Sequence, residues 1–193
     1  MSWANIPGWF DFDDIYKQAV DEAQDGALIV EVGCAFGRSL AYLAECVIAS
    51  GKKIHVHAVD IWPKFDPDTI TADAWGSEHA NLVKEVGGDS YLAFERLMDA
   101  ECPRWRGVVT IYRMPSVEAA KLHRAHSADL VFIDANHTYP FVKQDIEAWL
   151  EIVKPGGVIG GHDYTTGFPG VMQAVDEFFP NTPARRSSFW VRR

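Results

Sequence analysis

The stretch LIVEVGCAFGRS, from Leu28 to Ser39, decides the fold of this chain. Its first five residues form an apolar run interrupted only by Glu31, and such runs are typical of strands covered on both faces of a parallel sheet. Gly33 and Gly37 then permit a tight turn and a close backbone approach at the start of a helix. Strand, glycine turn and helix in this order favour a cofactor bound at the helix N-terminus.

The rest of the chain alternates apolar strand patterns with amphipathic helix patterns. Strands are expected at 28–32, 54–60, 107–113, 128–134 and 158–163, with a final edge strand at 187–192. Helices are expected at 12–23, 39–50, 90–98, 116–125, 142–153 and 171–179, the fifth of them stopped by Pro155, Gly156 and Gly157. This alternation predicts an α/β fold, a Rossmann-like doubly wound, mostly parallel sheet of about six to seven strands with helices on both faces.

The length and composition predict a single domain spanning residues 1–193. With 193 residues, of which 48% are hydrophobic, the chain can bury a sizeable core without disulfides. Residues 1–25 are expected to form an N-terminal segment and a helix. Residues 61–88 mix prolines, acids and aromatic side chains over more positions than an ordinary connection needs. We therefore predict that they form a lid or a substrate-facing insertion.

Charge and cysteine content narrow the choice of partners. A formal net charge of -9 disfavours a nucleic acid, whose binding depends on lysine and arginine neutralising phosphates. The arginines near the C-terminus are expected to form a solvated edge.

The three cysteines are odd in number and lack the spacing of zinc ligands, which favours a reducing cytoplasmic setting. No stretch reaches the ~20 apolar residues of a membrane span. A homodimer is compatible with the apolar N-terminus and the edge strand.

Candidate site residues follow the ends of the predicted strands, where ligands bind in open parallel sheets. Glu31 lies inside an apolar strand and needs a partner, such as a ligand cation or backbone donors. Asp60 ends the second strand, where it could accept the hydroxyls of a ribose or cap a turn. The turn reads GCAFG, with Ala35 at a position often held by glycine, so the strict dinucleotide fingerprint is absent. These features favour nucleoside binding over a nicotinamide enzyme.

Together with these residues, three later motifs resemble class I S-adenosylmethionine-dependent methyltransferases. They are FIDANHTYPFVKQDIEAWL at 132–150, KPGGVIGGHDY at 154–164 and PGVMQAVDEFF at 169–179. More narrowly, the chain is similar to small-molecule O-methyltransferases, including catechol O-methyltransferase and antibiotic-tailoring sugar and cephamycin enzymes. The resemblance implies S-adenosylmethionine as cofactor, with S-adenosylhomocysteine as product. The cofactor-binding residues that it implies, with their neighbours, are Glu31, Gly33, Cys34, Ala35, Gly37, Ser39, Asp60, Ile61, Trp62, Ser116 and Asp134.

Within this set, the resemblance implies that Gly33, Cys34, Ala35 and Ser39 line the methionine moiety, that Asp60 binds the ribose and that Ser116 lies near the adenine. Trp62 has three open roles: stacking on the adenine, shaping the entrance or packing in the core.

A metal site is a further expectation. Asp134 and Asp163 end the fourth and fifth strands, and with His162 they could hold Mg²⁺ or Mn²⁺. In the metal-dependent relatives the position of His162 is acidic or amidic. The alternative is therefore that Asp134 contacts the cofactor and that His162 is a hydrogen-bonded structural residue.

His137 is expected to be the general base, with Asp134 beside it as the second catalytic residue. It stands three residues after Asp134, where the catechol-type enzymes carry a catalytic lysine. With an unperturbed pKa of about 6.5, a histidine is largely neutral near pH 7 and can accept a proton. The alternative is a helix-cap histidine that bonds the turn at Thr138.

The sequence therefore predicts an enzyme that methylates a small hydroxylated molecule, with possible help from a divalent metal. Two other classes stay open. A non-catalytic cofactor-binding or scaffold domain would keep the glycine turn and Asp60. A nicotinamide-dependent oxidoreductase would share the fold but should carry the strict glycine fingerprint.

Overall fold

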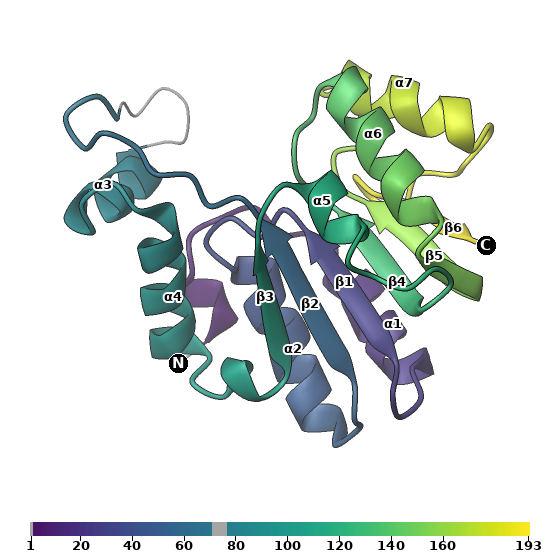
Figure 1. Cartoon of the computed structure of the whole chain (residues 1–193), viewed down its shortest axis with the longest axis horizontal. Coiled ribbons are helices and arrows are strands. Elements are labelled where there is room, and N and C mark those ends of the chain that lie inside the picture. Colours follow the sequence, from purple (N-terminus) through teal and green to yellow (C-terminus); the bar gives the residue numbers. More distant parts are fainter. Residues whose placement is uncertain (1, 71–76) are drawn as a thin grey trace.

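The computed structural model describes residues 2–70 and 77–193, and its centre is a single twisted sheet (Figure 1). The described strands are β1 (Leu28–Val32), β2 (His55–Asp60), β3 (Val109–Arg113), β4 (Ala128–Ile133), β5 (Val153–Gly161) and β6 (Phe189–Arg192). They lie in the order β3-β2-β1-β4-β5-β6, and only the β5–β6 pair is antiparallel. The predicted doubly wound, mostly parallel sheet is confirmed, and its strand order reverses between β1 and β4.

Helices cover both faces of the sheet, as predicted. One face packs against α1 (Asp13–Glu22), α2 (Arg38–Ser50) and α4 (Ser90–Glu101), and the other against α5 (Ser116–Ala120), α6 (Tyr139–Leu150) and α7 (Pro169–Phe178). Because side chains alternate along a strand, β1 sends Ile29 into the first core and Val30 and Val32 into the second. Short 3₁₀ turns, η1 (Trp3–Asn5) and η2 (Trp105–Gly107), complete the described elements, together with α3 (Ser77–Glu85).

The fifth strand begins earlier than the sequence pattern predicts. Val153 is already paired with Ala128, so α6 ends at Leu150, and Pro155, Gly156 and Gly157 lie inside β5. The prediction that these three residues stop a helix was therefore wrong. A register shift between Ala128 and Leu130, with Gly156 at φ 79°, accommodates them as an irregularity in the pairing.

Other predicted boundaries also move. The predicted helix at 116–125 ends at Ala120, the third strand begins at Val109 after η2, and the last strand begins at Phe189.

The C-terminal arginines form more than a solvated edge. Arg185 and Arg186 pair with Asp14 and Asp13 at the start of α1, 2.9 and 2.7 Å away.

The predicted insertion at 61–88 contains α3, which packs on α4, and Figure 1 shows α4 on the β3 side of the sheet with α3 farther out. Residues 71–76 of this segment lie outside the described part of the chain, and its role as a lid stays a prediction. Among the described residues, no helix has the length and apolar character to cross a membrane.

Candidate functional site

The glycine turn after β1 is the first part of the site. Gly33 and Gly37 have φ values of 88° and 89°, which L side chains rarely adopt. A Cβ on Gly33 would stand 2.0 Å from the carbonyl oxygen of Asp134, so glycine is what lets the ends of β1 and β4 approach. Ala35 also has a positive φ, of 45°. The turn therefore has the tight, close-packed form that the sequence predicts.

Asp60 holds this turn in place from the end of β2. Its Oδ2 accepts hydrogen bonds from the backbone amides of Cys34 and Ala35, both at 2.9 Å, and its Oδ1 accepts one from the Trp62 amide at 2.9 Å. The turn role considered for Asp60 is thus present in the structure. A carboxylate offers about four lone-pair sites, so three amides leave acceptor capacity for a ligand.

Trp62 packs beneath the same turn. Its indole is 1% exposed, donates a 2.7 Å hydrogen bond to the carbonyl of Ala35 and lies against the rings of Tyr91 and Phe94. The packing role predicted as one of three for Trp62 is therefore realised. Trp62 also forms part of the wall of a large cavity.

A cavity of about 590 Å³ opens at the carboxyl ends of β1, β2 and β4, beside the point where strand order reverses. Its size lies within the usual range for small-molecule and cofactor sites. Seven of the predicted cofactor residues line it: Gly33, Ala35, Asp60, Ile61, Trp62, Ser116 and Asp134. The edge of the sheet that the sequence indicated therefore carries a cavity of suitable size.

Four predicted cofactor residues are outside the cavity lining: Glu31, Cys34, Gly37 and Ser39. Glu31 shares the face of β1 that packs on α1 and α2, opposite to Val32, which does line the cavity. Its Oε1 accepts a 2.6 Å hydrogen bond from Ser39 Oγ. The structure thus gives Glu31 a serine hydroxyl beneath the turn as its partner, which differs from the ligand cation and the backbone donors named as examples from the sequence.

The environment of Glu31 strongly favours the neutral acid. The residue is 1% exposed, and burial raises the pKa of its carboxyl to about 8, although the bond from Ser39 acts in the opposite direction. A neutral carboxylic acid in a core avoids most of the cost of desolvating a charge.

Asp145 is a cavity residue that the sequence analysis missed. It lies on α6, is 6% exposed, and burial raises the pKa of its carboxyl while a hydrogen bond with Ser116 opposes the shift. Ser116 also accepts a 2.8 Å bond from the indole nitrogen of Trp149. Its position could have been predicted from the sequence, because Asp145 falls on the same helix face as the apolar residues Val142, Ile146 and Trp149.

A cluster of two carboxylates and two imidazoles stands at the ends of β4 and β5. His137 Nε2 is 2.8 Å from Asp163 Oδ2 and 3.9 Å from Asp134 Oδ1. His162 Nδ1 is 3.3 Å from Asp163 Oδ1 and 3.8 Å from Asp134 Oδ1. Asp134, His162 and Asp163 each offer one atom that could ligate a metal, and these three atoms lie within 4.8 Å of one another. The three predicted metal ligands are thus brought together, and Asp134 also borders the cavity.

The carboxylates shift the titration of both histidines. Asp134 and Asp163 raise the pKa of His137 to about 9. Burial alone would lower the pKa of His162, but the same two carboxylates and Asp11 raise it to about 9. Burial would raise the pKa of Asp163, yet hydrogen bonds from the two histidines hold it well below its usual range. The expectation that His137 is neutral near pH 7 is therefore wrong in this structure.

The alternative role of His137 as a helix cap is not what the structure shows. The amide of Thr138 is capped by Asn136 Oδ1 at 2.8 Å, whereas the His137 ring pairs with Asp163. His137 is 40% exposed and its ring lies against Phe168, with ring centroids 4.6 Å apart. The His137 side chain is therefore accessible from solvent, although His137 is not among the residues that line the large cavity.

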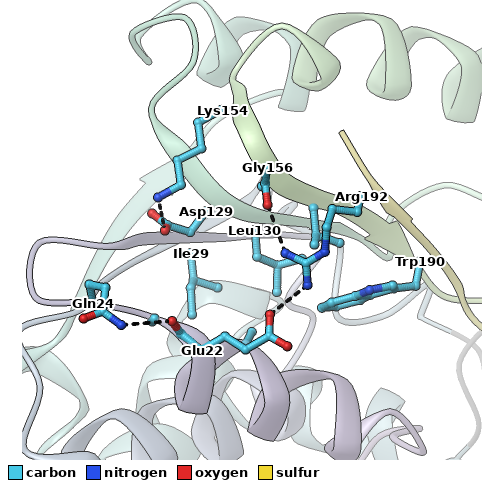
Figure 2. Close-up of a pocket in the computed structure, with 13 residues that line it drawn as sticks. Glu22, Gln24, Ile29, Asp129, Leu130, Lys154, Gly156, Trp190 and Arg192 are labelled. Carbon is cyan, nitrogen blue, oxygen red and sulfur yellow. Dashed lines mark hydrogen bonds and ion pairs between the residues drawn. The ribbon is translucent and has the colours of Figure 1, made fainter.

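A second, smaller cavity of about 190 Å³ lies at the opposite end of the sheet (Figure 2). Ile29, Leu130 and Trp190 supply its apolar walls, and two ion pairs cross its rim. Asp129 pairs with Lys154, and Glu22 pairs with Arg192 at 2.8 Å. These paired charges tie α1 and β4 to the last two strands, and none of the predicted site residues borders this cavity.

Comparison with known proteins gives a family match and fold relatives. A family model described as a methyltransferase domain matches residues 30–164. The calicheamicin methyltransferase CalS11 is 19% identical, with a TM-score of 0.64 over 93% of this chain and 76% of that chain. The O-methyltransferase NovP is 14% identical, with a TM-score of 0.63 over 94% and 79%.

A putative rRNA methylase from Clostridium thermocellum is also similar in fold, at 15% identity and a TM-score of 0.58 over 96% of this chain and 97% of that chain. At such identities the similarity establishes the fold alone. No curated protein sequence matches the chain.

Proposed function

This chain belongs to the methyltransferase-domain family, which uses S-adenosylmethionine, and we propose that it methylates a hydroxyl oxygen of a small molecule. The observation that carries the proposal is Asp134, which borders the large cavity and also belongs to the carboxylate–histidine cluster. A cofactor in the cavity would thus present its methyl group beside groups suited to holding and deprotonating a hydroxyl. CalS11 and NovP, both similar in fold, are named as methyltransferases, NovP as an O-methyltransferase.

The cavity residues suggest how the cofactor is held. We place the methionine end near the Gly33 turn and the ribose beside Asp60, whose remaining lone pairs can accept hydroxyl protons. The adenine would then extend toward Ser116 and Asp145. For Gly33, Asp60 and Ser116 these positions follow the roles that the family resemblance implies, whereas Asp145 is added because it lines the cavity.

The donor set of the cluster suits a divalent cation. Asp134 and Asp163 offer carboxylate oxygens and His162 offers a ring nitrogen, a mixture that fits Mn²⁺ better than Ca²⁺ and still admits Mg²⁺. When bound, such an ion would lower the pKa of an acceptor hydroxyl and orient its oxygen. The closeness of the three possible ligand atoms supports the fit.

His137 is the group we assign to the acceptor proton. The acceptor oxygen forms a bond to the methyl carbon while the carbon–sulfur bond breaks, which yields a methyl ether and S-adenosylhomocysteine. The released proton passes to the other ring nitrogen of His137, Nδ1, while Asp163 Oδ2, 2.8 Å from Nε2, accepts the Nε2 proton and orients the ring. Neutralising the neighbouring carboxylates would return the imidazole toward its ordinary pKa and so free it to accept that proton.

The test is S-adenosylhomocysteine formation with a panel of phenolic and sugar acceptors, with and without EDTA, and with structured RNA as a separate arm. We expect turnover on at least one small acceptor and a loss of rate with EDTA that Mn²⁺ or Mg²⁺ restores. Turnover on RNA alone would contradict the small-molecule assignment. The net charge of -9 argues against RNA, because phosphate binding needs an excess of basic groups.

A further inference from the structure

Asp11, far from the motifs in sequence, meets the outer edge of the His162 ring. The two residues are 151 positions apart, yet Asp11 Oδ1 lies 2.9 Å from His162 Nε2. The inner nitrogen, Nδ1, faces Asp163 and Asp134. The side chain of His162 is 10% exposed, whereas that of Asp11 is 49% exposed. One ring nitrogen is thus engaged by the N-terminal segment and the other points into the carboxylate cluster.

We propose that Asp11 is a positioning residue for the cation centre. By accepting the Nε2 proton, it makes Nδ1, the nitrogen that faces Asp134 and Asp163, the one that would ligate the cation. Histidines that ligate metals commonly donate their other ring N–H to a carboxylate in this way. The inference rests on the proposed function, because it requires that the cluster bind a cation.

Asp11 is itself held firmly, which makes it a suitable orienting group. Ser187 Oγ donates a 2.6 Å hydrogen bond to Asp11 Oδ2, and the guanidinium of Arg186 donates to the Asp11 carbonyl oxygen. The same guanidinium pairs with Asp13 at 2.7 Å. The loop before β6 thereby clamps the N-terminal segment against His162. Because these contacts already fix the geometry of Asp11, little conformational entropy is lost when it orients the His162 ring.

Asp14 supplies a matched control on the same segment. Its carboxylate pairs with Arg185 in the same loop, 2.9 Å away, and its removal also deletes one negative charge. A purely electrostatic effect of Asp11 on a cation would act through space whatever residue stands at 162. A positioning effect requires the imidazole, so the two can be separated by changing His162.

The experiment measures Mn²⁺ affinity by calorimetry and by the loss of the free-Mn²⁺ paramagnetic resonance signal, with S-adenosylhomocysteine present. Asp11→Ala should weaken Mn²⁺ binding ~10–100-fold, the range typical of outer-shell partners. Asp11→Asn, which keeps an acceptor oxygen, should weaken it less, and Asp14→Ala should leave it within about twofold of the starting protein. In a His162→Asn background, Asp11→Ala should change the affinity by less than about twofold, because no ring N–H is left to orient.

Two outcomes would overturn the inference, and they differ in whether the proposed cation centre is also ruled out. An equal loss of affinity on Asp11→Ala in both backgrounds would show a charge effect and would leave the cation centre intact. A starting protein with no saturable Mn²⁺ binding, although it binds S-adenosylhomocysteine, would remove both the cation centre and the role of Asp11. Urea unfolding of each variant identifies any loss of affinity that comes from a loss of folded protein.

Discussion

The buried acid Glu31 makes the stability of this protein depend on pH in a way that one isosteric change should remove. Its carboxyl is 1% exposed and burial raises its pKa to about 8, from an ordinary value of 4.5. Glu31→Gln keeps the shape of the side chain and a carbonyl oxygen that can still accept the hydroxyl proton of Ser39. The variant cannot ionise, so it isolates the cost of charging this site.

The sign of the effect follows from proton binding. Between pH 4.5 and 8 the folded protein holds a proton on Glu31 that the unfolded chain has released. The free energy of unfolding therefore falls as pH rises, by at most about 1.4 kcal/mol per pH unit for a single group. Over the interval from pH 5.5 to 7.5, the contribution of Glu31 amounts to roughly 2–3 kcal/mol.

Other groups titrate in the same interval, so the comparison must be a difference between proteins. His137 and His162, with pKa values raised to about 9, also lose their stabilising contribution as pH rises above about 6.5. Their contribution is common to the starting protein and to Glu31→Gln, and it cancels in the difference. The exposed Glu147 on α6 provides the control substitution Glu147→Gln.

The assay is urea unfolding followed by tryptophan fluorescence at pH 5.5, 6.5 and 7.5. Relative to the starting protein, Glu31→Gln should gain roughly 2–3 kcal/mol between the lowest and the highest pH. Glu147→Gln should run parallel to the starting protein at every pH. If Glu31→Gln also runs parallel, the carboxyl is ionised in the folded protein and the reasoning from burial is refuted.

Three further substitutions test the site itself. His137→Ala should lower the methyl-transfer rate ~10²–10⁴-fold while calorimetry finds unchanged S-adenosylhomocysteine affinity; an unaltered rate would remove His137 from the chemistry. Gly33→Ala places a Cβ 2.0 Å from the Asp134 carbonyl oxygen, so both cofactor affinity and the urea midpoint should fall, and an unchanged midpoint would contradict this close approach. Asp60→Asn turns an acceptor oxygen into an amino group facing amide donors, which should cost about 1–3 kcal/mol in urea unfolding; a neutral result would mean that the turn does not depend on Asp60.

The sheet and its site edge could be predicted from the sequence because both depend on local patterns. Apolar runs identify strands, and the carboxyl ends of parallel strands share one edge, so Asp60, Asp134 and Asp163 had to lie along the same edge of the sheet. The start of β5 was misjudged for a physical reason. Pro155 and Gly156 usually interrupt regular structure, but a register shift lets the strand continue through them.

The orientation of Glu31 could have been predicted with a stricter use of the strand period. Side chains two apart share a face, so Glu31 goes with Ile29 toward α1 and α2, whereas Val32 goes to the cavity side. The partnership of Asp11 with His162 could not have been found in this way. No local pattern links a residue before the first helix to one after the fifth strand.

A structural role for Asp60 and a ligand-binding role do not exclude each other. Its carboxylate takes three backbone amides, two from the turn and one from Trp62, and in doing so it fixes the loop that borders the cavity. Three amides leave part of the acceptor capacity of this carboxylate unused, so lone pairs remain for a ligand in the cavity that Asp60 borders. The bonds that anchor the turn would therefore also preorganise Asp60 as the acceptor for the ribose that we propose it binds.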